Sequence, residues 1–307
     1  MDDRRFLRRY AWLSIGAALL TMAIKTAAYV LTGSVGLLSD AVESTVNLVG
    51  ALMALWMLTV AARAPDEEHA YGHSKAEYFS SGVEGTLIVF AAVSIAAAAV
   101  RRLMVPRPIE DLGVGLAVST VASVVNLITA RIILAAGRRF ESVTLEANAH
   151  HLFTDVWTSV GVLAALGAVY ATGWQALDPV IGLGVAVNIV WTGVGIVRQS
   201  IRGLMDTALP LHEQQVLRAA IEKHAGAGVQ YHALRSRQSG SRKFLSVHVL
   251  VPGDWTVHRG HELLEEIEHE VRVALPGVTV FTHLESLEDP SSWDDQTLDR
   301  RGRATAE

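Results

Sequence analysis

The chain has 307 residues, 50% of them hydrophobic and 19% charged, and its mean hydropathy is +0.31. This composition excludes an ordinary soluble protein of that size, and the net charge of −5 gives no indication of nucleic-acid binding. The absence of cysteine from the sequence excludes disulfides and thiolate metal sites, so any metal must be held by nitrogen and oxygen ligands. Composition therefore indicates a membrane protein.

Six apolar stretches are each long enough for a helix that crosses a bilayer, which takes about 20 residues. They lie approximately at 10–31, 35–61, 80–103, 111–136, 146–171 and 178–203. Basic residues at the start of the chain, after the fourth stretch and at the end of the sixth would all lie on one side, which should be the cytoplasm. The sequence thus predicts a multi-pass protein of the cell (inner) membrane, with six transmembrane helices in residues 1–208 and both termini in the cytoplasm.

Residues 209–288 have the composition of a small soluble domain. Helical periodicity over 211–225 and 257–275, and strand patterns over 229–238, 244–251 and 278–285, predict the order α-β-β-α-β. We expect a ferredoxin-like α+β cytoplasmic domain with its helices on one face of the sheet. Residues 289–307 have little to bury and are predicted to form a disordered tail.

Polar clusters interrupt the second and fifth apolar stretches. Glu43 and Asn47 are four residues apart in one stretch, and the same spacing separates His151 and Asp155 in the other, so each pair shares a helix face. Ionisable groups at membrane depth are unfavourable to bury and mark an ion or proton path. Carboxylate, amide and imidazole together could close a four-ligand shell of the kind that zinc prefers.

Two further polar residues, Asp40 and Asn148, precede Glu43 and His151 by one turn and would orient the ligands. The alternative is that all these side chains only link helices through hydrogen bonds. Two pairs with matched spacing exceed what packing needs, which favours the metal site. His150 points about 100° away from His151 on a helix, so a packing or water-facing role is favoured for it.

A second cluster lies in the loop between the second and third stretches. Asp66, His69 and His73 bring three possible ligands together in sequence, and Gly72 lets the backbone turn between the two histidines. The alternative is a solvated, charged loop without metal.

The predicted soluble domain contains eight of the twelve histidines of the chain. A metal site there would combine residues from the strands and the second helix, namely His232, His248, His261, His283 and Glu285. From the residues alone, a scatter of surface and core histidines is an equally good interpretation.

Several motifs, in order along the chain, together resemble one known family. They are the segments 34–40, 69–77, 151–155, 206–210 and 234–240. From about residue 10 to 290 the chain resembles the cation diffusion facilitator family, and within it the bacterial ferrous-iron and zinc efflux pumps. The resemblance implies a homodimer in the lipid bilayer that exports divalent metal from the cytoplasm in exchange for protons.

By the same resemblance, the three clusters above match the intramembrane, loop and cytoplasmic metal sites of the family, with Glu285 where better-known members usually carry Asp. The resemblance also implies a salt bridge between Lys75 and Asp206 at the dimer contact. Asn47 departs from the pattern, since many members have Asp or His at both second-span positions, and a neutral amide leaves fewer proton acceptors. Zn²⁺ is the favoured metal, as cargo and as regulator, while Fe²⁺, Mn²⁺, Co²⁺ and Cd²⁺ stay open.

Other classes of protein fit less well. An intramembrane metalloprotease needs a helical His-Glu-x-x-His motif, which the sequence lacks, and no enzyme is expected. An exporter of organic cations would use carboxylates and aromatic residues rather than a His–Asp pair. The main alternative is a membrane-tethered metal sensor without transport, because the cytoplasmic histidines alone would serve it. The four polar residues at membrane depth favour transport, since a sensor gains nothing from them.

Overall fold

The computed structural model describes residues 3–32, 35–105, 113–174, 176–226, 228–294 and 296–297. The chain forms two compact units, Met1–Leu204 and Met205–Glu307, each with its own packing. The division falls four residues before the predicted end of the transmembrane domain at residue 208.

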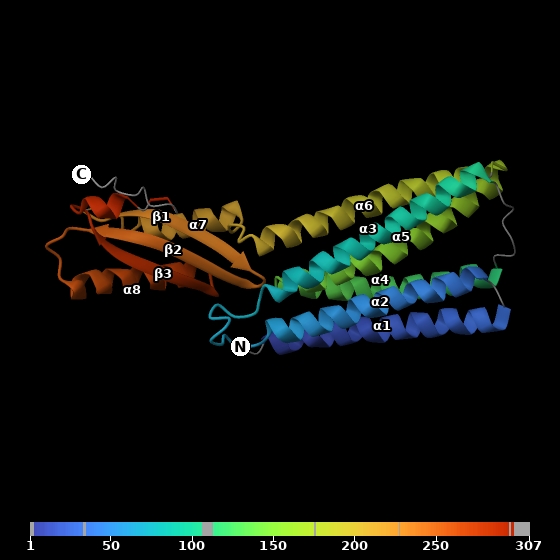
Figure 1. The fold of residues 1–307 in the computed structure, drawn as a ribbon, viewed down its shortest axis with the longest axis horizontal. Coiled ribbons are helices and arrows are strands. Elements are labelled where there is room, and N and C mark those ends of the chain that lie inside the picture. Colours follow the sequence, from blue (N-terminus) through green and yellow to red (C-terminus); the bar gives the residue numbers. More distant parts are fainter. Residues whose placement is uncertain are drawn as a thin grey trace, which may run out of the picture. The chain divides into compact units, whose positions relative to one another are not determined.

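The first unit consists of six long helices, which confirms the predicted helix order (Figure 1). They are α1 (Asp3–Thr32), α2 (Val35–Ala61), α3 (Ala76–Met104), α4 (Gly113–Arg139), α5 (Val143–Thr172) and α6 (Leu177–Leu204). Within the described residues, four segments are long and apolar enough to cross a membrane: Leu7–Leu31, Ala76–Met104, Ala117–Arg139 and Pro179–Leu204. In α2 the corresponding apolar segment among these residues is shorter, Asn47–Ala61.

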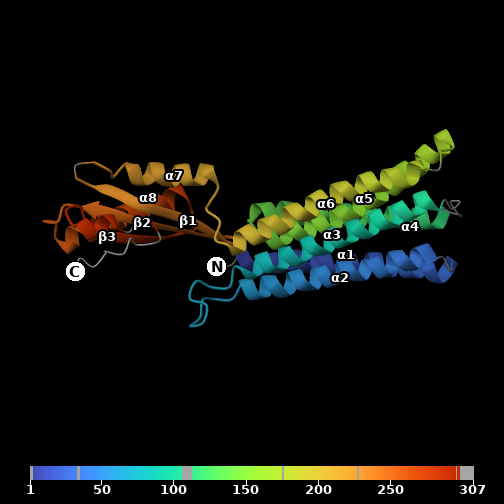
Figure 2. The ribbon, with the colours of Figure 1, turned by 45° about the horizontal axis from the view of Figure 1, so that its top comes forward.

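The helices of this unit pack largely in pairs, α3 along α6, α1 along α2 and α4 along α5 (Figure 1 and Figure 2). Small residues let α3 and α6 approach closely. A Cβ on Gly85 would lie 3.1 Å from the carbonyl oxygen of Gly193, and a Cβ on Gly193 would lie 3.1 Å from that of Gly85. Close backbone approach at small residues is typical of helices in a bilayer, where apolar surface alone gives no driving force for association.

Hydrogen bonds fix the first turn of α5 against the first turn of α3. Ser142 caps α5 by accepting the backbone N–H of Leu145, and its hydroxyl donates to Glu77 Oε2 at 2.6 Å. Thr144 Oγ1 donates to the backbone carbonyl of Glu77 at 3.1 Å. These bonds set the position along the bundle of every residue further on in α5.

The second unit contains the predicted α-β-β-α-β order. Its elements are α7 (Leu211–Glu222), β1 (Gln230–Ser239), β2 (Arg242–Val251), α8 (Val257–Ala274) and β3 (Val278–Ser286). The sheet order is β1-β2-β3. An antiparallel hairpin joins β1 to β2 at Gly240, whose φ is +57°, and α8 forms the crossover that the parallel pair β2 and β3 requires.

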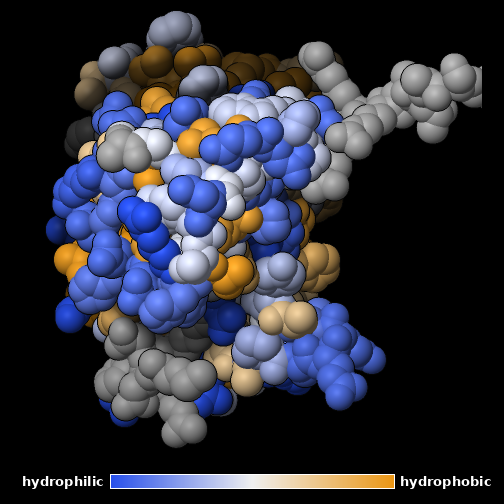
Figure 3. All heavy atoms as spheres, turned by 90° about the vertical axis from the view of Figure 1, so that its left-hand side faces the viewer, coloured by the Kyte–Doolittle hydropathy of each residue, from blue (hydrophilic) through white to orange (hydrophobic). Residues whose placement is uncertain are grey.

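Both helices of this unit pack against the same face of the sheet. The core between them includes Leu217 from α7, Ile267 from α8, and Val247 and Val249 from β2. Because side chains alternate along a strand, His248 lies on the opposite face. The side of this unit seen in Figure 3 is mainly hydrophilic, as expected for a domain outside the membrane.

The segment after β3 differs from the predicted disordered tail. Residues 290–293 form a short 3₁₀-helix, η1 (Pro290–Trp293). Asp289 Oδ1 accepts the backbone N–H of Ser291 at 2.8 Å, and the indole N–H of Trp293 donates to the carbonyl of Leu287 at 3.1 Å. A cap and one aromatic anchor therefore order a segment whose composition alone indicates disorder.

Candidate metal sites

Helices α2 and α5 bring three of the predicted ligands into contact inside the helix bundle. Asn47 and His151 are 5% and 7% exposed. His151 Nε2 lies 2.6 Å from Asn47 Oδ1, and Asn47 Nδ2 donates to Asp155 Oδ2. The amide of Asn47 thus connects the imidazole to the carboxylate.

Asn126 of α4 also contacts this group, although the sequence analysis does not predict it there. Asn126 is 3% exposed, and its Nδ2 donates to Asp155 Oδ2 at 3.0 Å. The only sequence signal for this residue is an amide between apolar neighbours, Val125 and Leu127. Two amide donors on one carboxylate oxygen hold Asp155 in a single orientation and stabilise its negative charge.

The fourth predicted ligand stays a prediction. The backbones of Asp40 and Glu43 belong to α2, but their side chains lie outside the described residues. Asn148 donates from Nδ2 to Glu84 Oε1 on α3 at 3.0 Å. His150 lies beside Phe153, with ring centroids 6.5 Å apart, which agrees with a packing role.

The hydrogen-bond directions in the buried group determine which atom carries a proton. An ionised carboxylate only accepts, so Asn47 turns Nδ2 toward Asp155 and Oδ1 toward His151. An amide oxygen also only accepts, so Nε2 of His151 carries the hydrogen in this arrangement. A metal ion needs the lone pair of that nitrogen, so metal binding there requires the hydrogen to leave Nε2, either to Nδ1 of the same ring or to another base.

The loop between α2 and α3 gathers Asp66, His69 and His73. Asp66 Oδ1 accepts the backbone N–H of His69 at 2.7 Å, and Oδ2 lies 3.4 Å from His73 Nε2. Gly72, with φ +82°, turns the chain, and the two imidazole rings lie 4.4 Å apart. The hydrogen bond from the His69 backbone lowers the pKa of the Asp66 carboxyl below its ordinary value of 3.8. One ligand atom from each residue lies within 4.8 Å of the others, which is compatible with one shared ion.

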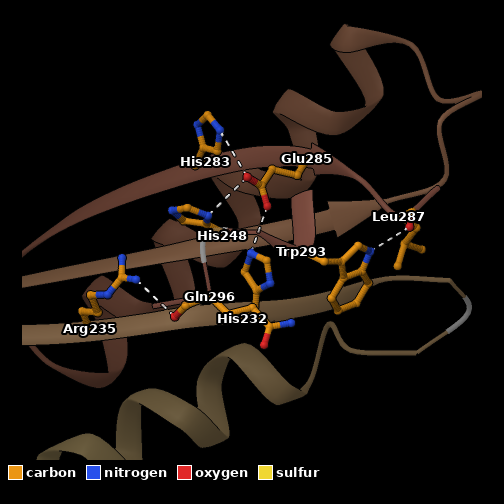
Figure 4. A network of polar contacts seen from close by, with 8 residues as sticks. All are labelled: His232, Arg235, His248, His283, Glu285, Leu287, Trp293 and Gln296. Carbon is orange, nitrogen blue, oxygen red and sulfur yellow. Dashed lines mark hydrogen bonds and ion pairs between the residues drawn. The ribbon is translucent and has the colours of Figure 1, made fainter. Parts of the chain in front are cut away.

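In the second unit, the strand register aligns three histidines across the sheet (Figure 4). His232 is paired with His248, and His248 with His283. All three approach the carboxylate of Glu285, with distances of 2.9 Å from His232 Nε2, 3.3 Å from His248 Nδ1 and 3.5 Å from His283 Nε2. Trp293 of η1 packs edge-on against the ring of His232, with centroids 5.7 Å apart.

A bulge in β1 directs His232 toward this cluster. The register shifts between His232 and Arg235, and Ala233 has φ +49°. Tyr231 and Leu234 both pack on the helix-covered core, although regular alternation would put them on opposite faces. The bulge reverses the alternation of side chains between Tyr231 and Leu234, so that both face the core. His232 therefore lies on the other face of the sheet, which α7 and α8 do not cover.

The ligand atoms of His232, His248 and Glu285 lie within 4.8 Å of one another. Two ligands at 2.0–2.2 Å from a zinc ion are at most about 4.4 Å apart, so small side-chain rotations would close a site here, with His283 near enough for a fourth ligand. His261, on α8, is exposed. It makes no hydrogen bond or ion pair with this cluster among the described residues. The structure therefore gathers four of the five predicted residues.

The two residues predicted to form a dimer salt bridge have other contacts in the structure. Lys75 Nζ donates to the carbonyl of Leu204 at 3.3 Å, and Asp206 pairs with Arg237 at 3.1 Å. Lys75 and Asp206 belong to different units, and their mutual salt bridge stays a prediction.

The first unit has helices that can cross a membrane and, among them, a group of polar side chains with ligand types for a cation. These features are typical of membrane cation transporters. Residues 11–205 match the family model described as the cation efflux transmembrane domain. Residues 209–287 match the model described as the cytoplasmic domain of cation efflux proteins. The chain belongs to the cation efflux family, also called the cation diffusion facilitators, and it is a metal cation efflux transporter.

Full-length relatives agree with this assignment. The uncharacterized transporter sll1263 of Synechocystis is 52% identical over 289 residues, which cover 94% of this chain and 93% of that protein. The cation-efflux pump FieF of Salmonella arizonae is 28% identical over 288 residues, which cover 94% of each chain. A solved structure of CzrB is 34% identical, covering 25% of this chain and 96% of that chain, with a TM-score of 0.24 that carries no argument about the fold.

Proposed function

We propose that this transporter is a homodimer that exports zinc from the cytoplasm in exchange for protons. The observation that carries the proposal is the bridge of Asn47 between His151 and Asp155. Metal binding needs a neutral imidazole and ionised carboxylates, so protons and metal compete for the same lone pairs of this group, which is what exchange requires. Alternating access would then let metal bind from the cytoplasm and let protons expel it on the other side.

The proposed ligand set also suits a divalent ion. His151 supplies a neutral nitrogen, and Asp155 with Glu43 would supply two negative charges that balance Zn²⁺. Asn47 Oδ1 would complete the four ligands that zinc favours. Fe²⁺, Mn²⁺, Co²⁺ and Cd²⁺ are the competing substrates, because nitrogen and oxygen ligands bind all of them.

Separate observations support the proposed orientation in the membrane and the proposed homodimer. Basic residues gather at the start of the chain and at the ends of α4 and α6, on what would be the cytoplasmic side. The family model matched by residues 209–287 describes a cytoplasmic domain and bears the name ZT_dimer. Cross-linking in native membranes would test the dimer, and a purely monomeric product would contradict it.

Transport in reconstituted vesicles tests the proposal. A pH gradient is imposed across the membrane, and zinc flux is followed with a metal-sensitive dye. We expect flux to follow the proton gradient and to be lost in His151→Ala and Asp155→Ala. His150→Ala is the matched control, since it removes the neighbouring imidazole on the same helix and should transport like the wild type.

Zinc flux that ignores the pH gradient would contradict proton exchange. Wild-type flux in His151→Ala would contradict the proposed site. A competition assay with the other four divalent metals would identify the preferred cargo, and weak competition by zinc would contradict zinc as the substrate.

We also propose that the cluster around Glu285 regulates transport by binding metal. A metal bound there would favour whichever dimer arrangement it binds more tightly. His248→Ala should then raise the metal concentration for half-maximal transport by roughly tenfold while leaving the maximal rate intact. Complete loss of transport in correctly folded protein would contradict a regulatory role. Membership of an efflux family favours transport over the tethered sensor without transport.

A further inference from the structure

A carboxyl group on α3 is buried inside the helix bundle and forms no ion pair among the described residues. Glu84 is 0% exposed, on a helix that packs against α2, α5 and α6. Its hydrogen-bond partner among the described residues is Asn148, whose Nδ2 donates to Oε1 at 3.0 Å. Glu84 Oε2 and Asn148 Oδ1 are both buried, and neither has a hydrogen-bond partner within the part of the chain that the structure describes.

No neighbouring charge compensates this carboxyl in the described structure. The described side chains of α2 include no titratable group, and Gly50 of that helix faces the carboxyl, since a Cβ there would lie 3.6 Å from Oε1. The described titratable groups of α5 and α6 are Glu146, His150, His151, Asp155, Arg198 and Arg202. Among these described residues, none forms a hydrogen bond or ion pair with Glu84.

A single proton would satisfy both unpaired atoms. An ionised carboxylate in such a position is strongly unfavourable, because it is removed from water and has only one neutral donor. Protonation of Oε2 removes the charge and turns this oxygen into a donor. Asn148 Oδ1 is a buried acceptor without a donor among the described residues, so carboxyl and amide would each donate to the other.

We infer that Glu84 holds a proton in this state and is a proton-binding residue of the transport cycle, distinct from the metal ligands. This inference rests on the proposed proton exchange. Asn148 precedes His151 by about one turn of α5, so the Glu84–Asn148 pair lies toward the N-terminal, proposed cytoplasmic, end of that helix. When that side opens, the O–H bond of Glu84 breaks, the proton passes to cytoplasmic water, and the electron pair stays on Oε2. A proton arriving from the other side restores the carboxyl.

Glu84→Gln tests the inference directly, because glutamine keeps the shape and offers Asn148 a donor but carries no exchangeable acidic proton. In vesicles that contain a pH-sensitive and a zinc-sensitive dye, we expect one fewer proton per zinc ion than in the wild type. Equilibrium dialysis against Zn²⁺ alone should show unchanged zinc affinity. Thr86→Ala, an exposed position two residues further along α3, is the matched control and should keep the wild-type ratio.

An unchanged proton-to-zinc ratio in folded Glu84→Gln protein would overturn the inference, and so would loss of zinc binding, which would make Glu84 a metal ligand. If Glu84→Gln fails to fold, infrared spectra of the wild type and Glu84→Asp provide the second test. We expect the carbonyl band of a protonated carboxylic acid at neutral pH, shifted in Glu84→Asp, and its absence would overturn the inference. Wild-type protein that moves zinc without protons would instead contradict the proposed exchange itself.

Discussion

The buried group of α2 and α5 and the cluster on the C-terminal sheet both combine imidazole with carboxylate, but they differ in how far water reaches them. Asn47 and His151 are almost fully buried; His151 Nε2 bonds to Asn47 Oδ1, and Asn47 Nδ2 donates to Asp155. On the sheet, three imidazoles converge on the one carboxylate of Glu285, and the His283 side chain is 62% exposed while those of His232, His248 and Glu285 are 10%, 17% and 8% exposed.

This difference indicates how the two sites can respond to metal. In the bundle a metal ion would replace internal hydrogen bonds and compete with protons for the same lone pairs, so the proposed binding there would be linked to protonation. On the sheet the strand register already holds the ligands near each other, and one of them, His283, is open to water. Such a site can follow the metal concentration of its surroundings with little rearrangement, which suits regulation.

The largest effect is expected when one charge is removed from the buried group. This change also tests whether the two sites are independent. Asp155→Asn keeps the shape but leaves Asn47 and Asn126 facing another amide instead of a carboxylate. We expect zinc transport to fall by roughly 100-fold or more, because a ligand and its negative charge are both lost. Zinc binding at the C-terminal cluster should persist in equilibrium dialysis. Loss of binding at both sites would show that they are not independent.

Glu285→Gln makes the reciprocal change on the sheet. The three histidines lose the carboxylate that they share, so zinc affinity at that cluster should fall by roughly 10- to 100-fold. Transport at saturating zinc should stay near the wild-type rate. Glu262→Gln, at an exposed position on α8, is a matched control for the loss of one carboxylate. If Glu285→Gln lost as much transport at saturating zinc as Asp155→Asn, the two sites could not be separated into a transport site and a regulatory site.

Asn126→Ala tests whether the hydrogen bond from α4 positions Asp155 in the buried group. Asp155 would keep the donor from Asn47 but lose the donor from α4. We expect transport to need about tenfold more zinc, as is usual when a group that orients a metal ligand is removed. Asn188→Ala, at an exposed position on α6, is the control for the loss of a helix amide that the structure does not place beside Asp155. Unchanged zinc dependence in Asn126→Ala would show that this hydrogen bond does not position the ligand.

The smallest expected effect concerns the exposed loop and its pH dependence. The pKa of Asp66 is lowered by the His69 backbone N–H, so its contribution to loop stability is present above 3.8 and is lost as the pH falls through the lower folded value. Asp66 therefore stays ionised in neutral and weakly acidic solution. Asp66→Asn should weaken zinc binding by the loop throughout this pH range, because an ionised ligand is lost. An unchanged zinc affinity of the loop would contradict Asp66 as a ligand.

Local sequence patterns predicted most of the fold. The six helices follow from long apolar stretches, and the α-β-β-α-β order follows from periodicity and from the turn at Gly240. Local patterns could not reveal the order in segment 290–293, because contacts of Trp293 with Leu287 and His232, outside the segment, stabilise it. They also could not reveal the bulge at Ala233, which depends on Tyr231 and Leu234 both packing on one core.

The sequence by itself determined that polar residues with metal-ligand chemistry lie within apolar helices, because spacing and residue type are local properties. Only the tertiary structure decided that Asn47 connects His151 to Asp155, that Asn126 of α4 joins them, and that Glu84 faces Asn148. These contacts join residues far apart in the chain, and helix packing selects them. Periodicity shows which face of a helix is polar, but not which face of which neighbouring helix it meets.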